Sequence, residues 1–402
     1  LTSYIEYITN ALPGGYEIMV NLLPAIIIGG PPHAGKSVLF TSLTKALSER
    51  GVRHHAIRAC PDGEGNWSQE ADQDVVRDIR IIGPWTDEFV EGICRDLERR
   101  HLPLLVDMGG RPTELQTHIL HHCTHSLLLL RADKEEDAQR WLHLVAENGL
   151  LPVAQLYSEL DGIASLTAKY PIIEGTLTSL QRGFDASGLV FETLVERIAS
   201  LFLYSNEELE QTKLAMAPTE LVVNLYDLLK KIAPQATSWK PEMIPAVLEE
   251  LPANTALSVY GKAPHWLYGT LAAHSGEQAF YQFDPRIGWL CPPLFQLSTQ
   301  TSTEVIGTPR VFEQYTRLSI GIVRKHLDYL QAKHLPFPPV AADKGLILDG
   351  QTPSWVITAL VRLYKRAGVA WIACYQPTLQ QAVVVTSQST AYAPGDLVAM
   401  PT

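Results

Sequence analysis

Residues 24–37 read PAIIIGGPPHAGKS, an apolar run followed by a loop rich in Gly and Pro. The run is typical of a buried parallel strand, and the amphipathic segment Ser37–Arg50 behind the loop predicts a helix. Between the two, Gly30 to Ser37 fits the pattern G-x-x-x-x-G-K-[ST], whose backbone N–H groups surround phosphates. A strand, a loop of this pattern and a helix, in that order, predict a nucleoside triphosphate site.

Three residues around this loop have expected roles in phosphoryl transfer. Lys36 would reach the β- and γ-phosphates, and Ser37 would ligate magnesium. The apolar run Leu104–Asp107 predicts a second strand that places the Asp107 carboxylate beside the same metal; the alternative is an ordinary aspartate before a turn. Lys36 and Asp107 are the candidate catalytic residues, and Ser37 and Asp107 are the candidate metal ligands. The predicted nucleotide contacts are Gly30, Pro31, Pro32, His33, Ala34, Gly35, Lys36, Ser37 and Val38.

Two absences from the sequence favour ATP as the nucleotide. Met108 follows Asp107, where hydrolytic AAA machines carry Glu. The predicted fifth strand, Val153–Leu160, lacks the Asn-Lys-x-Asp sequence that reads guanine. The sequence therefore predicts a kinase-like or switch-like P-loop ATPase that uses Mg²⁺.

An acidic loop follows the predicted second strand and reads CPDGEGNW over residues 60–67. Its Asp62 and Glu64 could hold magnesium, activate a water or bind an acceptor hydroxyl. The alternative is a tight Asp-Gly turn with solvated carboxylates. Arg111 and Arg131, just beyond strand ends, are candidates for stabilising transition-state charge, with surface ion pairs as the alternative.

The order of elements predicts an α/β fold with a doubly wound sheet in the N-terminal part. Short apolar strands alternate with amphipathic helices from Pro24 to about Leu203. The polar segment 206–218 then ends at a Pro, which places a domain boundary there. The predicted domains are a P-loop NTPase domain over residues 1–205 and two small α/β modules over 218–305 and 306–402.

The second part of the chain contains an internal repeat. LSVYG (257–261) continues as KAPHWLYGTLAA, and LILDG (346–350) continues as QTPSWVITALVR. Both read as a strand, a Gly, a Pro, a Trp and a helix, and the matching Gly261 and Gly350 are 89 residues apart. The repeat predicts two related modules. Trp266 and Trp355 are expected to pack in the core, with stacking on a base as the alternative.

The first repeat also carries charged residues at a strand end. Asp284 and Arg286 place a carboxylate and a guanidinium on one face, which suits metal or phosphodiester contact. A turn closed by an ion pair is the alternative. Together with Gly261, Pro264 and Trp266, they give a segment that resembles the Csx-three family of CRISPR-associated ring nucleases. The resemblance covers about 219–298, with a weaker one over about 317–402, and the N-terminal domain resembles the AAA-type ATPase that accompanies such modules in fused bacterial proteins.

This resemblance implies a ligand, a cofactor and an assembly. Family members are small α/β dimers that bind cyclic tetra-adenylate, a messenger of type III CRISPR signalling, and can cleave it. Mn²⁺ is described for some RNA-cleaving activity in the family. Two tandem modules would form a built-in pseudo-dimer, and the resemblance also implies a homo-oligomer.

The resemblance carries over residue by residue. Asp284 and Arg286 match the family's catalytic pattern, and His274 lies one or two positions from the family's histidine, with a solvated helix-end histidine as the alternative. In the second repeat Lys365 and the sequence Gln376-Pro377-Thr378 occupy these places, so that module has lost its acid–base residues. The predicted ligand contacts are Gly261, Lys262, Ala263, Gly350, Gln351 and Thr352. An active nuclease, a nucleotide or small-molecule kinase, and a non-catalytic messenger sensor all stay open as functions.

Composition limits the other classes of function. The chain has 402 residues and a formal net charge of −11, which argues against non-specific binding of duplex DNA. Its five cysteines stand singly, which argues against zinc ribbons and disulfide frameworks. His118, His121, His122, Cys123 and His125 are spaced like metal ligands, but solvated histidines at a helix end are the expected outcome. Apolar runs fall short of the ~20 residues of a membrane span, and a cytoplasmic protein is expected.

Overall fold

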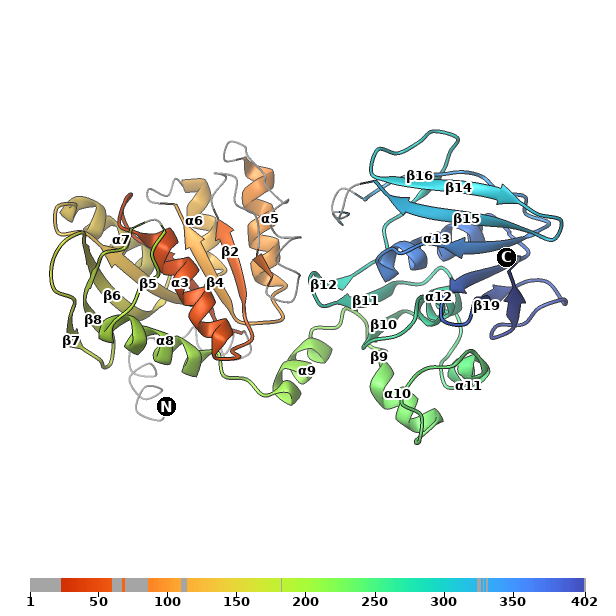
Figure 1. Cartoon of the computed structure of the whole chain (residues 1–402), viewed down its shortest axis with the longest axis horizontal. Helices are drawn as coiled ribbons and strands as arrows, with labels where there is room; N and C mark the ends of the chain where they lie inside the picture. Colours follow the sequence, from red (N-terminus) through yellow and green to blue (C-terminus); the bar gives the residue numbers. More distant parts are fainter. Residues whose placement is uncertain are drawn as a thin grey trace. The chain divides into compact units, whose positions relative to one another are not determined.

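A computed structural model of the chain describes residues 23–59, 67–68, 86–109, 114–181, 183–323, 327, 329 and 332–400. The chain forms two compact units, which divide between Thr212 and Lys213 (Figure 1). The helix α9 (Asn206–Ala215) contains the division point. Each unit has its own sheets and its own hydrophobic core.

The N-terminal unit is built on one sheet whose described strands have the order β3-β2-β4-β1-β5-β6-β8-β7. The inner strands run parallel, and the edge strands β3 and β7 pair antiparallel to their neighbours. The strands are β1 (Ala25–Gly29), β2 (His55–Ala59), β3 (Trp67–Ser68), β4 (Leu104–Met108), β5 (His125–Leu130), β6 (Leu151–Glu159), β7 (Ser165–Ala168) and β8 (Ile173–Thr178). This large parallel sheet confirms the α/β prediction for the unit.

Helices cover both faces of this sheet, as the apolar strands require. Every residue of β1, β4 and β5 is buried, and a parallel sheet buried on both faces needs a helix layer on each. One core packs α3 (Lys36–Glu49) and α8 (Leu189–Leu201) against the sheet. The other packs α5 (Asp87–Glu98), α6 (Glu114–His121) and α7 (Glu135–Glu147) against the opposite face (Figure 1). The carboxyl ends of β1, β2 and β4 therefore meet at one edge of the sheet, where the P-loop begins.

The C-terminal unit contains two sheets that share one topology. The first has the order β9-β10-β11-β12, and the second contains the run β15-β17-β18-β19. In each set three parallel strands are followed by an antiparallel one. The first set is β9 (Val222–Asn224), β10 (Leu257–Tyr260), β11 (Phe280–Asp284) and β12 (Gly288–Leu290); the second is β15 (Tyr315–Ile322), β17 (Gly345–Asp349), β18 (Trp371–Gln376) and β19 (Gln381–Ser387). We call these sets, each with its helix, the first half and the second half of the unit.

One helix connects the second and third strands of each half. These helices are α12 (His265–His274) and α13 (Ser354–Arg366), and they begin 89 residues apart, as the matching glycines do. The strand ends Asp284 and Gln376 are 92 residues apart, because α13 has 13 residues and α12 has 10. The shared topology and the equal spacing of the glycines and of the helix starts support the internal repeat.

Reciprocal contacts relate the two halves by an approximate two-fold axis. Gln282 of β11 accepts a hydrogen bond from Thr358 of α13 and donates one to Ser354, both at 2.8 Å. The equivalent pair brings Cys374 of β18 to Gly269 of α12, where a Cβ would lie 3.6 Å from the sulfur. Each helix therefore contacts the sheet of the other half, and one continuous core contains residues of both.

Further elements complete the unit. They are α10 (Leu225–Ile232), a 3₁₀ turn (Pro241–Met243), α11 (Ile244–Glu249), the hairpin partner β14 (Val305–Val311), the edge strand β20 (Leu397–Ala399), and the pair β13 (Gln296–Leu297) and β16 (Pro336–Phe337). The sequence analysis does not predict the hairpin of β14 with β15. Trp266 and Trp355 are 2% and 0% exposed, which confirms core packing for both.

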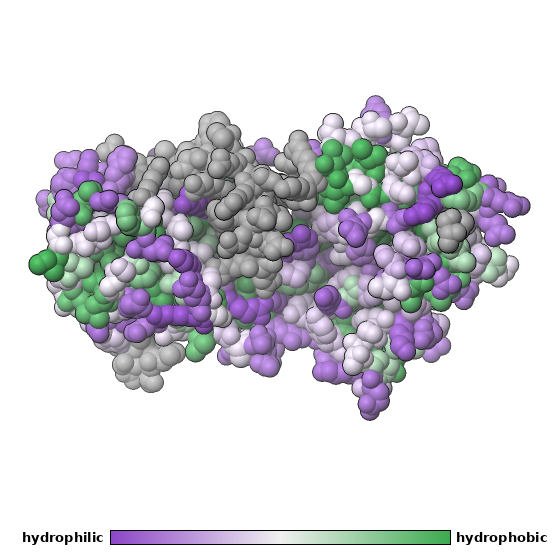
Figure 2. Space-filling view, viewed as in Figure 1, coloured by the Kyte–Doolittle hydropathy of each residue, from purple (hydrophilic) through white to green (hydrophobic). Residues whose placement is uncertain are grey.

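The visible surface of each unit mixes hydrophobic and hydrophilic residues (Figure 2). Within the described residues, no helix is long and apolar enough to cross a membrane.

Candidate functional site

The loop between β1 and α3 turns at two glycines. Gly30 has a φ of 143°, and a Cβ there would lie 2.0 Å from the carbonyl oxygen of Leu129. Gly35 precedes α3 with a φ of 85°. Glycine adopts these conformations at low cost, whereas other residues rarely do. The loop thus takes the tight path on which backbone N–H groups and a helix N-terminus can face phosphates.

Lys36 lies across this loop. Its side chain donates hydrogen bonds to the carbonyl oxygens of Gly30 and Pro31, both at 2.9 Å, and the residue is 8% exposed. A phosphate would offer the same ammonium group a charged acceptor, and charge-assisted hydrogen bonds are stronger than those to neutral carbonyls. Lys36 is therefore placed to exchange loop carbonyls for phosphate oxygens.

Ser37 and Asp107 come together beside the loop. Asp107 near the end of β4 is in register with Ile28 of β1, and Ser37 Oγ donates to Asp107 Oδ2 at 3.2 Å. A hydroxyl and a carboxylate side by side are the hard oxygen donors that Mg²⁺ prefers. These two residues fit a Mg²⁺ site that phosphates and water would complete. The structure thus brings together the three residues to which the sequence assigned phosphoryl transfer.

The strand order shows how Asp107 comes to lie beside the P-loop. β4, which carries Asp107, is the hydrogen-bonded neighbour of β1, which leads into the P-loop. Asp107 therefore reaches Ser37 from the strand adjacent to β1, and the resemblance to AAA-type ATPases stays a prediction.

A second basic residue, missed from the sequence, lies at the metal-side carboxylate. Arg58 of β2 is in register with Asp107, and its Nε lies 3.9 Å from Asp107 Oδ2. The guanidinium carbon also lies 5.7 Å from the ring centroid of Phe40 on α3. The only local signal was a basic residue inside the otherwise apolar end of the strand HAIRA, and its meaning depends on which strand is adjacent.

Arg131 supports the shape of the P-loop. It follows β5 and forms two hydrogen bonds with the carboxylate of Asp133, at 2.9 and 2.6 Å. A third bond joins its Nη1 to the carbonyl oxygen of His33 at 3.2 Å. The hydrogen bond to Asp133 raises the pKa of Arg131. The ion-pair alternative is therefore what the structure shows for Arg131, while Asp62, Glu64 and Arg111 lie outside the described residues.

The histidine cluster divides between surface and core. His118 and His121 are exposed on α6, as expected for helix-end histidines. His125 was also expected to be solvated, but it is buried in β5, and burial lowers its pKa to about 4. In the described parts of the chain, no group of three or more His, Cys, Asp or Glu residues is arranged to hold a metal ion.

The predicted ligand contacts of the C-terminal unit lie at the N-terminal ends of α12 and α13. Residues 261–263 lie in the loop between β10 and α12, and residues 350–352 lie in the loop between β17 and α13. The described first turns of both helices carry neither a side-chain cap nor an acidic residue. Burial lowers the pKa of His265, and a hydrogen bond from its ring to the backbone of Thr352 partly offsets that effect. This bond shows that the structure brings the two loops together, one from each half.

Asp284 ends β11 at the same edge of the sheet. Strand alternation places it on the face of Gln282, which contacts α13. Asp284 accepts hydrogen bonds from the backbone N–H and the Nη2 of Arg286, both at 2.9 Å, and this pair raises the pKa of Arg286. The side chain of Arg286 is 51% exposed. In the second half Gln376 donates to Thr378 at 2.9 Å, so a neutral pair replaces the charged one.

His274 lies at the opposite edge of the first half. It is the last residue of α12, and its carbonyl oxygen accepts a hydrogen bond from Asn254 N at 2.9 Å, just before β10 begins. Its Nε2 lies 2.9 Å from the carbonyl oxygen of Leu251. The ring lines a cavity of about 220 Å³ together with Lys365 of the second half. Within one chain the structure therefore places His274 and Asp284 at opposite ends of the strands.

Comparison with known proteins bears on one part of the chain. Residues 321–399, which include β17, α13, β18 and β19, match the family described as CRISPR-associated protein (Cas_csx3). The sequence analysis gave the stronger resemblance to the first half, whereas this match falls in the second. Chloroplast FtsY from Physcomitrella patens is a similar solved structure, with 13% identity, a TM-score of 0.28, and coverage of 50% of this chain and 72% of that chain. That score is too low to bear on the fold.

No curated protein matches the chain. By its match over residues 321–399, the second half of the C-terminal unit is similar to a CRISPR-associated module of the Cas_csx3 family.

Proposed function

We propose that the N-terminal unit binds ATP with Mg²⁺ and transfers the terminal phosphoryl group to water. The observation that carries this proposal is the hydrogen bond of 3.2 Å between Ser37 Oγ and Asp107 Oδ2 beside the P-loop. In phosphoryl transfer a protein mainly positions groups and neutralises charge. Lys36 would contact the phosphates, and Ser37 and Asp107 would hold the metal, which supplies positive charge to the phosphate oxygens.

The C-terminal unit is proposed to bind a cyclic oligoadenylate, with cyclic tetra-adenylate as the expected ligand. The site is the edge formed by the loops 261–263 and 350–352, where the N-termini of α12 and α13 offer backbone N–H groups to phosphates. A ring with four equal nucleotides has the two-fold symmetry that relates the halves. The exposed guanidinium of Arg286 adds a positive charge near this edge.

The match to the Cas_csx3 family supports a CRISPR-related role for the chain. We place that role in type III signalling, with ATP turnover coupled to the messenger-bound state. The expected homo-oligomer and the cytoplasmic location stay predictions.

A messenger sensor is the second candidate, and one observation favours it over a nuclease. Cleavage by an acid–base pair needs both groups at the scissile phosphate. Asp284 and His274 lie at opposite edges of the first half, and the second half has Gln376 and Thr378 where the first has Asp284 and Arg286. A single chain therefore offers a phosphate cradle with an incomplete acid–base set beside it.

The test is calorimetric titration of the full chain with cyclic tetra-adenylate, with and without ATP and Mg²⁺, followed by analysis of the recovered ligand. Tight binding that changes with ATP supports the coupled function. Intact ligand indicates a sensor, and cleaved ligand indicates a nuclease, in which case Asp284→Ala and His274→Ala should stop the cleavage. Absence of binding under every condition would refute the messenger part.

The ATP part has its own variant. Lys36→Ala should abolish ATP turnover, whereas Lys45→Ala should leave it unchanged. Lys45 lies on the same helix, but it is 56% exposed and pairs with Asp185, so it controls for loss of a lysine from α3. Turnover that survives in Lys36→Ala would contradict the assignment of this site.

A further inference from the structure

Ser37 and Arg58, which belong to different elements, both lie beside the carboxylate of Asp107, the candidate metal ligand. Asp107 Oδ2 accepts a hydrogen bond from Ser37 Oγ at 3.2 Å and lies 3.9 Å from Arg58 Nε. The side chain of Asp107 is 4% exposed and that of Arg58 is 12% exposed. Solvent screens such a partly buried pair much less than it screens a surface pair.

The position of Arg58 is fixed by the fold. Arg58 and Asp107 are direct neighbours on adjacent parallel strands, so both side chains leave the sheet on the same face. On that face the guanidinium carbon lies 5.7 Å from the ring centroid of Phe40, within the usual range of a cation–π contact. Strand register and an aromatic ring therefore keep this positive charge beside the carboxylate.

We infer that Arg58 is a positioning residue that makes metal binding at Asp107 depend on bound nucleotide. The inference rests on the proposed function of the P-loop. The guanidinium already supplies positive charge to the carboxylate, so it repels a divalent cation that approaches Asp107 alone. At separations of a few ångströms in a partly buried site, this repulsion weakens cation binding by about tenfold or more.

A bound nucleotide would reduce this repulsion, because its phosphates place negative charge near Arg58 and Lys36. The phosphates bring several negative charges to the loop, and these offset the guanidinium as well as the ammonium group. Arg58 therefore disfavours a lone cation but tolerates one that enters with phosphates. The consequence is a site that takes the metal–nucleotide complex in preference to free metal.

The experiment measures binding of Mn²⁺, a paramagnetic probe for Mg²⁺, to the full chain by electron paramagnetic resonance, with and without ADP. Arg58→Met removes the charge and keeps an unbranched stem that can lie along Phe40. It should bind Mn²⁺ about tenfold more tightly than the wild type without nucleotide, and the difference should shrink when ADP is present. Arg58→Lys keeps the charge and should behave as the wild type does. Arg58→Gln provides a second neutral variant if the methionine variant does not fold.

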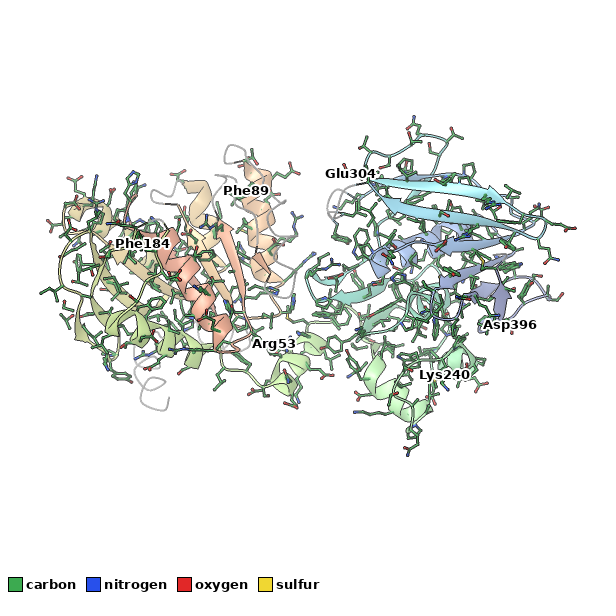
Figure 3. All side chains as sticks on the ribbon, in the orientation of Figure 1. Arg53, Phe89, Phe184, Lys240, Glu304 and Asp396 are labelled. Atoms are coloured by element: carbon green, nitrogen blue, oxygen red, sulfur yellow. The ribbon has the colours of Figure 1, made fainter. Side chains whose placement is uncertain are left out.

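Arg53→Gln is the matched control, because it removes the same charge from an exposed residue of the same unit (Figure 3). Arg53 donates a hydrogen bond to Asn206 at 3.1 Å and lies two residues before β2 begins. Equal Mn²⁺ affinity in Arg58→Met and the wild type would overturn the inference, and so would an equal gain in Arg53→Gln or in Arg58→Lys. Failure of the wild type to bind ADP would instead refute the proposed nucleotide site.

Discussion

Burial of His125 makes one contribution to the acid sensitivity of the N-terminal unit. The residue begins β5 and is 8% exposed, and burial lowers its pKa from 6.5 to about 4. Between these values the unfolded chain holds a proton on this ring and the folded unit does not, so the free energy of unfolding falls as the pH decreases. Relative to pH 8, the loss from this group is about 2 kcal/mol at pH 5 and about 3 kcal/mol at pH 4. His125→Gln does not titrate and should remove this loss.

The assay is hydrogen exchange followed by mass spectrometry, on peptides that cover residues 125–130, at pH 8 and at pH 5. The wild type and the variant are compared at each pH, so the intrinsic exchange rates cancel. The change in opening free energy between the two pH values should be smaller in the variant by about 2 kcal/mol. His143→Gln, which removes a histidine with a 74% exposed side chain, should leave the change as it is in the wild type. Equal acid sensitivity in His125→Gln and the wild type would show that this buried ring does not govern the response.

Three further predictions concern the loop, the metal site and the two-fold contact. Ser37→Ala should lower Mg²⁺-dependent ATP turnover by about 100-fold, as measured by steady-state kinetics. Its affinity for ADP without metal, measured by calorimetry, should stay within a few-fold of the wild type. An equal loss of turnover and of ADP affinity would point to a damaged loop. Gly30→Ala should cost about 1–3 kcal/mol of stability in urea unfolding, because its Cβ would lie 2.0 Å from Leu129 O, whereas Gly92→Ala, whose nearest atom is 3.9 Å away, should be tolerated. Gln282→Leu and Thr358→Val should each cost about 1–3 kcal/mol, and the double variant should cost less than their sum, because each single change leaves a buried polar partner unsatisfied. Strict additivity would mean that the bond of 2.8 Å contributes no coupling.

The parts of the fold that follow from local pattern could be predicted from the sequence. The run Ala25–Ile28 and the glycines after it require a strand and a tight loop, and the structure has β1 and the P-loop there. The spacing of Gly261 and Gly350 indicated a repeat, and the equal strand order of the two halves supports it. In each case the signal is a short local pattern, and the repeat is the same pattern found twice, 89 residues apart.

The parts that depend on pairing between distant segments could not be predicted in the same way. Arg58 lies beside Asp107 because β2 pairs with β4, and the pattern within one strand does not specify which strands are its neighbours. The positions of His274 and Asp284 at opposite edges follow from the direction of α12 relative to β11, although the two residues are only ten positions apart in the sequence. His125 could not be recognised as a core residue because its neighbours in the sequence, His121 and His122, lie at the end of a helix.

The two halves of the C-terminal unit differ in the residues at their mutual contact and in the charged pair at the strand end. At the two-fold contact, the first half contributes Gln282 to a hydrogen bond with Thr358, while the equivalent contact is between Cys374 and a glycine. The contact is therefore a polar bridge on one side and close packing on the other. The charged pair of Asp284 and Arg286 likewise occurs in one half. Because both halves belong to one chain, the loops 261–263 and 350–352 come together without dimerisation, and the proposed ligand would meet one guanidinium of this kind there. The ligand stoichiometry should therefore be one per chain at any protein concentration, and titration over a hundredfold range of concentration would reveal a dependence on assembly.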